Sequence, residues 1–162
     1  MKKHTSIAAV LAVLFTMSAN AMDCPVKVTD GDFDGTQYTD QVTALIAKKK
    51  SCADAKELAE ACAFGSSIDG VIVSEALVVC DKNINGNLKA PILKAKNQKT
   101  KAAAQAKAAN TLKTYANTRD LCDSKYAEVE GTIGVSVRSF CYLDVAYLFS
   151  NLTEKSSVGA QD

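Results

Sequence analysis

The chain has 162 residues, of which 48% are hydrophobic, 23% charged and 6% aromatic, and it contains six Cys, one His and no Trp. This length predicts a single domain, and the hydrophobic fraction excludes wholesale disorder. The formal net charge of +1 is close to zero, but it hides a strong segregation of charged residues along the chain.

The first 21 residues are typical of a bacterial secretory signal peptide. Two lysines are followed by an apolar run over residues 7–17 and by Ala19-Asn20-Ala21. A basic start, a short apolar core and small residues at the end define this class of segment. The run is too short to span about 30 Å of hydrocarbon as a stable helix, so we expect no transmembrane segment. We expect residues 1–21 to be removed, leaving one periplasmic or secreted domain over residues 22–162.

The single histidine, His4, lies inside the expected signal peptide, so the mature chain should contain none. This excludes Ser-His-Asp and Cys-His nucleophile systems and every His-ligated metal site. Paired carboxylates occur at Glu57/Glu60 and at Glu128/Glu130, but no motif builds around them the desolvated pocket that acid–base catalysis needs. We therefore expect a protein that is not an enzyme and that uses no cofactor.

An Asp/Gly-rich loop is expected over residues 22–38. Within it, residues 30–35 (Asp-Gly-Asp-Phe-Asp-Gly) fit the first six positions of an EF-hand calcium loop. The metal ligands would be Asp30, Asp32 and Asp34. The twelfth position is Gln41 rather than a bidentate Glu, so a simple Asp/Gly turn is the alternative. A weaker repeat at residues 81–86 contains one carboxylate, and the Asn-Gly end of a helix is its alternative.

Apolar residues at helical spacing follow this loop. Capping residues and glycines set the expected limits, with Gly65 ending the second helix and Asn85-Gly86 ending the third. The spacing predicts helices over residues 39–50, 51–64, 69–84, 91–130 and 135–152. β-branched residues make a strand the alternative for residues 69–84, but the apolar spacing fits a period of 3.6 better than 2.

The segment 91–130 is rich in Ala and Lys and has no Gly, which predicts one long helix. Its first half carries few large apolar residues, so we expect this half to project from the body or to lie loosely on it. The second half should return to the core through four side chains: Leu112, Tyr115, Leu121 and Tyr126.

All six cysteines follow the expected signal peptide, and an even count in an exported chain predicts three disulfides. If antiparallel helices turn near residue 66 and near residue 132, bonded cysteines should be equidistant from each turn. This symmetry predicts Cys52–Cys80 and Cys122–Cys141, which leaves Cys24–Cys62. Six buried free thiols are the alternative. The expected fold is thus an all-α, compact bundle of about five helices whose hairpins are stapled by three disulfides.

Charge is segregated along the mature chain. Residues 82–119 contain eight Lys and one Arg but no Asp or Glu. The flanking segments are acidic: residues 22–81 contain five basic and eleven acidic side chains, and residues 120–162 contain three basic and seven acidic side chains. One interpretation is a basic helix that meets anionic phospholipid, envelope polymer or an acidic protein. The leading residues would be Lys94, Lys96, Lys99, Lys101 and Lys107. The alternative is a solvated helix packed beside the acidic flanks of its own domain. Nucleic acid is a poor candidate because no aromatic residue lies among these lysines.

Three motifs occur in residues 80–150. The first, Asp81-x-x-Ile84-Asn85-x-x-Leu88, is similar to the pattern D-x-x-L-N-x-x-Y. The second, Tyr115-x-x-x-Arg119-Asp120-x-Cys122, is similar to W-x-x-x-R-D-x-x-C. The third, Gly131-Thr132-Ile133 before Cys141, is similar to G-[ST]-I…C. In this order they resemble the N-terminal-domain family of LprI-type lysozyme inhibitors, which are small exported helical proteins of bacteria with paired cysteines. Residues 22–79 match that pattern poorly, and Tyr115 stands where the family has Trp.

The resemblance implies a protein that binds and occludes a lysozyme or another peptidoglycan hydrolase. Arg119 and Asp120 would belong to the contact, and a helix-surface pair beside a disulfide is their alternative role. Many lysozymes are strongly basic and would repel the Lys-rich helix, so the acidic segment 30–35 would have to meet them. A hydrolase with an acidic surface, or a role as an immunity protein against a toxin, fits the basic helix better. The second functional hypothesis is a non-catalytic envelope-binding or structural module that uses the Lys-rich helix. A calcium-responsive module is the third.

Overall fold

Five α-helices make up the described part of the protein. The structure, a computed structural model, describes residues 23–27 and 34–158. The helices are α1 (Gly35–Ile46), α2 (Cys52–Ala61), α3 (Ile68–Lys94), α4 (Gln98–Lys125) and α5 (Gly131–Val158), with no strand in these ranges. The expected all-α bundle of about five helices is confirmed.

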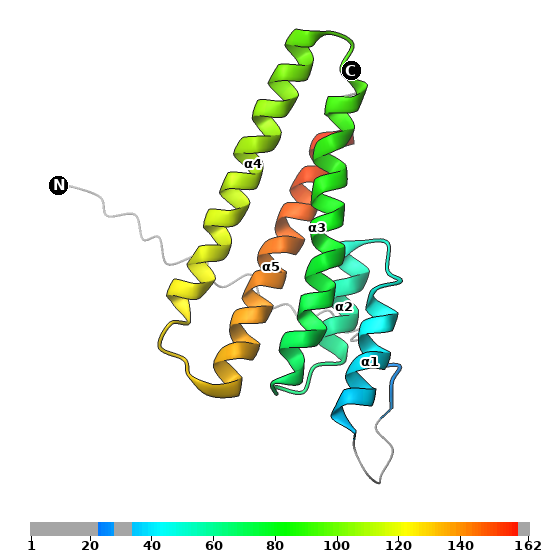
Figure 1. The fold of residues 1–162 in the computed structure, drawn as a ribbon, viewed down its shortest axis with the longest axis vertical. Helices are drawn as coiled ribbons and strands as arrows, with labels where there is room; N and C mark the ends of the chain where they lie inside the picture. Colours follow the sequence, from blue (N-terminus) through cyan, green and yellow to red (C-terminus); the bar gives the residue numbers. More distant parts are fainter. Residues whose placement is uncertain (1–22, 28–33, 159–162) are drawn as a thin grey trace, which may run out of the picture.

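Three long helices, α3, α4 and α5, run along the long axis of the molecule (Figure 1). α3 packs most extensively against α5, and α4 contacts both of them. The shorter α1 and α2 lie against one end of α3. The last turns of α3 and the first turns of α4 extend beyond the ends of the other helices in Figure 1. The first half of the Lys-rich helix therefore projects from the body.

The hydrophobic core lies where α1, α2, α3 and α5 meet. α3 provides most of it, because its apolar residues recur at the helical spacing that the sequence shows. Its fully buried side chains include Ile72, Val73, Ala76, Cys80 and Ile84, and α5 adds Leu143 and Ala146. The predicted helical assignment of residues 69–84, rather than the strand, is confirmed.

α4 touches the bundle along one narrow stripe. Its buried residues are Ala108, Tyr115 and Cys122, which are seven residues apart and so lie on one face of the helix. The prediction that Leu121 returns this helix to the core is wrong, because that side chain is 65% exposed. Leu112, in the same helix, is also exposed. With one stripe buried, most of the α4 surface faces solvent.

α1 begins four residues earlier than expected. Asp34 is its N-cap, and the carboxylate oxygen accepts hydrogen bonds from the backbone N–H groups of Thr36 and Gln37 at 2.9 and 3.2 Å. The earlier start brings Tyr38 into the core. Its hydroxyl donates to the backbone oxygen of Cys62 at 2.9 Å, which ties α1 to the end of α2.

α3 does not end at Asn85-Gly86, as the sequence predicted, but continues to Lys94 with Pro91 inside it. Asn87 explains part of this, because its side-chain N–H group donates to Thr153 Oγ1 of α5 at 3.3 Å. Packing on α5 thus overrides the local Asn-Gly signal. The helix breaks instead at residues 95–97, where Asn97 and Thr100 form a capping box that starts α4. The expected single helix over residues 91–130 is wrong at both ends.

Three disulfides link the elements with the pairing that the hairpin symmetry predicted. Cys52–Cys80 joins the start of α2 to the middle of α3, Cys122–Cys141 joins α4 to α5, and Cys24–Cys62 fastens the N-terminal segment to α2. Each bond contributes about 2–4 kcal/mol, chiefly by restricting the unfolded chain. Asn83 reinforces the first, because its side chain donates to the Lys50 backbone oxygen and accepts from the Cys52 N–H.

Two glycines of the helices should respond in opposite ways to alanine. A Cβ atom at Gly134 would lie 1.9 Å from the backbone oxygen of Val129, so Gly134→Ala must displace the α4–α5 turn. We expect it to lower the free energy of unfolding by about 1–3 kcal/mol. A Cβ at Gly86 meets nothing within 4 Å in α3. Gly86→Ala should therefore raise the free energy of unfolding by about 0.5–1 kcal/mol. Denaturant unfolding of both variants checks this, and a destabilised Gly86→Ala would contradict it.

Candidate functional site

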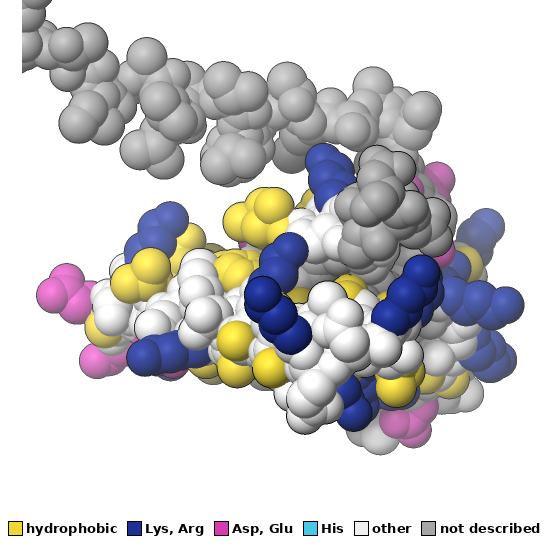
Figure 2. Space-filling model, turned by 90° about the horizontal axis from the view of Figure 1, so that it is seen from above, with side chains coloured by type: hydrophobic (Ala, Val, Ile, Leu, Met, Phe, Trp, Pro, Cys, Tyr) yellow, Lys and Arg dark blue, Asp and Glu magenta, His cyan; other side chains and the backbone are white. Residues whose placement is uncertain are grey.

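The end of the molecule formed by α3 and α4 carries most of the Lys-rich segment. We call residues 89–107 the basic hairpin; it contains the last turns of α3, the turn at 95–97 and the first turns of α4. Six lysines of the basic hairpin are exposed: Lys89, Lys94, Lys96, Lys99, Lys101 and Lys107. Figure 2 views the molecule from above, with Lys and Arg side chains in dark blue around this end and Asp and Glu side chains in magenta toward the rim.

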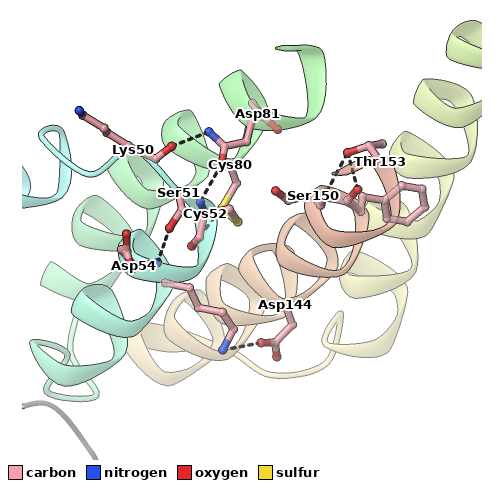
Figure 3. The surroundings of a disulfide bond; sticks show 12 residues. Lys50, Ser51, Cys52, Asp54, Cys80, Asp81, Asp144, Ser150 and Thr153 are labelled. Carbon is pink, nitrogen blue, oxygen red and sulfur yellow. Dashed lines mark hydrogen bonds and ion pairs between the residues drawn. A yellow bond between two sulfur atoms is a disulfide. The ribbon is translucent and has the colours of Figure 1, made fainter. Parts of the chain in front are cut away.

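These lysines make no ion pair with a carboxylate in the described ranges. The ion pairs found there both involve Lys56, which contacts Glu60 and Asp144. Other acidic side chains of the flanks are also engaged, since Asp81 accepts a hydrogen bond from Tyr115 and Asp69 is buried. Figure 3 shows Asp144 in its ion pair and Asp81 next to the Cys52–Cys80 disulfide. The positive charge of the basic hairpin therefore faces solvent without direct neutralisation by these flanks.

The start of α4 places cations where the helix dipole disfavours them. Lys99 and Lys101 lie in or next to the first turn, which contains no acidic residue. The N-terminus of a helix carries partial positive charge, so cations there cost about 0.3–1 kcal/mol each. These lysines thus lower the stability of the helix that carries them. The same arrangement strengthens the attraction of this end for anions.

The structure divides the predicted contact residues into separate groups. Lys94, Lys96, Lys99 and Lys101 lie at the tip of the basic hairpin, and Lys107 lies further along α4. Arg119 is further still along α4, where its guanidinium group lies 5.6 Å from the Tyr115 ring and 5.0 Å from the Tyr142 ring. Asp120, its neighbour, is exposed. Arg119 and Asp120 are therefore not part of the basic hairpin.

Residues of the first two sequence motifs do meet in space. Tyr115 donates a hydrogen bond to Asp81 Oδ1 at 2.8 Å, its ring packs 5.2 Å from that of Phe149, and Arg119 lies over it. Tyr142, which also contacts Arg119, donates a hydrogen bond to Asp123. These contacts hold α3, α4 and α5 together. The motif residues thus have a structural role, and the sequence carried no signal for Tyr142 as their partner.

The stability of this cluster should depend on pH above pH 10. Burial, and then the hydrogen bond to Asp81, raise the pKa of the Tyr115 phenol, against an opposing effect of Arg119. The unfolded phenol ionises near pH 10, whereas the folded one keeps its proton. Its contribution to stability is therefore complete below about pH 10 and is lost as the pH rises further. Tyr115→Phe should lower stability at pH 7 by about 1 kcal/mol and flatten the alkaline decline. Denaturant unfolding across pH 8–12 measures both, and parallel curves would contradict the assignment.

The structure describes only part of the first candidate calcium loop, residues 30–35, but all of the second, residues 81–86. Asp30 and Asp32 of the first loop lie outside the described residues, and Asp34 caps α1. The second motif at residues 81–86 is not a loop, because it lies inside α3. That motif is therefore wrong as a calcium loop. In the described ranges, no group of three or more His, Cys, Asp or Glu side chains could hold a metal ion.

Together, the fold and the site define a class of protein: a small, disulfide-bonded helical protein with an exposed basic hairpin. No protein-family model, curated protein or solved structure matches the chain. The three disulfides indicate an oxidising compartment outside the cytosol. None of the helices in the described ranges has the length and apolar character to cross a bilayer.

Proposed function

We propose that this protein is an exported, non-catalytic module that binds an anionic phospholipid surface of the bacterial envelope through the basic hairpin. The observation that carries the proposal is the set of exposed lysines that no carboxylate pairs with in the described ranges. Each lysine close to an anionic membrane contributes about 1 kcal/mol of attraction. The four lysines at the tip supply enough attraction for reversible binding.

The tip also favours a membrane over a soluble polymer. Leu93 is 84% exposed in the last turn of α3, next to Lys94. A single exposed leucine among lysines suits the boundary between headgroups and acyl chains, where the apolar side chain is buried and the ammonium groups stay in water. The signal-like N-terminal segment and the disulfides support a periplasmic or secreted location for this contact.

Vesicle flotation tests the proposal directly. The disulfide-bonded protein should float with phosphatidylglycerol-containing vesicles at about 0.01 M salt and be released at about 1 M, because the Debye length falls from about 30 Å to about 3 Å. Vesicles of phosphatidylcholine alone should retain little protein under either condition. Equal retention on both kinds of vesicle, or retention that salt does not change, would contradict the proposal.

Inhibition of a peptidoglycan hydrolase or a toxin is the second candidate function, and the projecting shape of the basic hairpin favours it. Glycosidases of this class cleave with a pair of carboxylates in a cleft. A narrow, basic tip complements an acidic cleft of this kind in a hydrolase whose surface is also acidic, whereas a strongly basic lysozyme would repel it. Near-stoichiometric inhibition of peptidoglycan hydrolysis would support this function, and no inhibition across a panel of hydrolases would defeat it.

A further inference from the structure

A groove of about 610 Å³ lies between α3, α4 and α5, on the body side of the basic hairpin. Leu88 of α3 and Phe149 and Leu152 of α5 give it an apolar surface. Leu152 is 50% exposed, so this surface is open to solvent. The lining residues of α4 and α5 each cover about two helical turns, or about 10 Å of axis. The volume is in the range of small-molecule sites, about 300–1,000 Å³.

The hydroxyl groups that line this groove are already used within their own helices. Thr111 donates to the Lys107 backbone oxygen at 2.9 Å, Thr153 to that of Phe149 at 2.9 Å, and Ser156 to that of Leu152 at 3.0 Å. Because these protons point into the helices, they are not available to a polar ligand. The walls are therefore more apolar than their composition indicates, and they suit a hydrocarbon chain.

One charged side chain lines the groove, the exposed Lys107 of α4. No lining residue carries a carboxylate. The sequence around Lys107 has none either, since residues 82–119 contain no Asp or Glu. An apolar surface with one cation at its edge is complementary in charge to an amphiphile with one hydrocarbon chain and one negative group.

We propose that this groove binds one medium-chain fatty acid. The acyl chain lies on Leu88, Phe149 and Leu152, and the carboxylate meets the ammonium group of Lys107. This site is separate from the tip lysines, so it does not rest on the proposed membrane contact. A protein with both sites holds a free fatty acid beside an anionic surface.

Calorimetric titration of the disulfide-bonded protein with dodecanoate, below the concentration at which it forms micelles, tests the site. We expect one bound molecule per chain and an affinity that rises about fourfold per methylene from hexanoate to octanoate, because each buried methylene contributes a fixed transfer free energy. The gain should level off toward dodecanoate, because the groove is only about 10 Å long. Lys107→Gln should weaken binding about tenfold, as loss of a hydrogen bond to a charged group does. Lys113→Gln removes an exposed lysine of α4 that does not line the groove, and it should leave the affinity unchanged.

A second variant keeps the test decisive without removing charge. Thr111→Trp fills the groove, so it should abolish dodecanoate binding while circular dichroism shows an unchanged helix content. The Thr111→Trp variant should still float with anionic vesicles. This result distinguishes failure of the groove site from failure of the proposed membrane contact. The proposal would be overturned if the wild type does not bind dodecanoate or if its affinity does not depend on chain length. It would also be overturned if Lys107→Gln and Thr111→Trp bind dodecanoate as tightly as the wild type does.

Discussion

Asp69→Ala is expected to lower the free energy of unfolding by at least about 3 kcal/mol. Asp69 is fully buried, and its carboxylate accepts hydrogen bonds from the backbone N–H groups of Phe64, Gly65 and Ser66 in the α2–α3 turn at 2.9–3.1 Å. It also accepts one from the Ser136 hydroxyl of α5 at 2.8 Å. Alanine leaves the buried Ser136 hydroxyl without its acceptor and removes the carboxylate from the three part-buried N–H groups of the turn. A buried donor without a partner costs about 1–3 kcal/mol.

Two further substitutions provide smaller stability changes with which the effect of Asp69→Ala can be compared. Ser136→Ala removes one of the four donors and should cost about 1 kcal/mol. Asp40→Ala removes an exposed carboxylate of α1 and should change stability by less than about 0.5 kcal/mol. Denaturant unfolding under oxidising conditions, with the disulfides intact, measures all three. The assignment fails if Asp69→Ala is no less stable than Asp40→Ala.

Reversing the charge of Lys99 and Lys101 together should weaken binding to anionic vesicles about a thousandfold while stabilising the protein. Each reversal removes about 1 kcal/mol of attraction and adds a repulsion of similar size. The same change places carboxylates at the start of α4, where the helix dipole favours them by about 0.3–1 kcal/mol each. A loss of binding together with a gain in stability cannot come from partial unfolding.

The matched control for Lys99→Glu/Lys101→Glu is the same reversal at Lys48 and Lys50. Lys48 follows the C-terminal end of α1, where the helix dipole favours cations, and Lys50 precedes Ser51, the N-cap of α2, where it disfavours them. Both lysines lie beside the middle of α3, where Asn83 donates to the Lys50 backbone oxygen, and not at the tip. The two dipole effects offset each other, so Lys48→Glu/Lys50→Glu should change stability little and keep most of the vesicle binding. Flotation and denaturant unfolding measure both pairs, and equal losses of binding would place the contact elsewhere.

Particular residues show how far sequence reasoning reached. Two of the cysteine pairs could be predicted because antiparallel helices joined by a turn place residues that are equidistant from that turn opposite each other. Asn85-Gly86 misled the prediction of the α3 end, because contacts of Asn87 with α5 outweigh a local stop signal. Leu121 was expected in the core, but α4 buries a single stripe and leaves this side chain outside.

The candidate sites, too, could be predicted from the sequence only in part. The lysines of residues 82–119 are evident from the sequence, since charge is counted along the chain. The absence of ion pairs between these lysines and carboxylates in the described ranges is not evident from the sequence. It depends on which side chains Asp69, Asp81 and Asp144 contact in the fold. The groove beside Lys107 is lined by residues of three successive helices, from Leu88 to Ser156, so no local pattern could indicate it.

The sequence by itself determined the helical class, the disulfide pairing and the segregation of charge, because helix propensity, cysteine spacing and charge order are properties of the chain. Only the tertiary structure decided where α3 ends, which acidic side chains are engaged, and that the lysines project on a hairpin above an apolar groove. Those features depend on which side chains face each other across helices, and packing settles that after the local preferences have formed the helices.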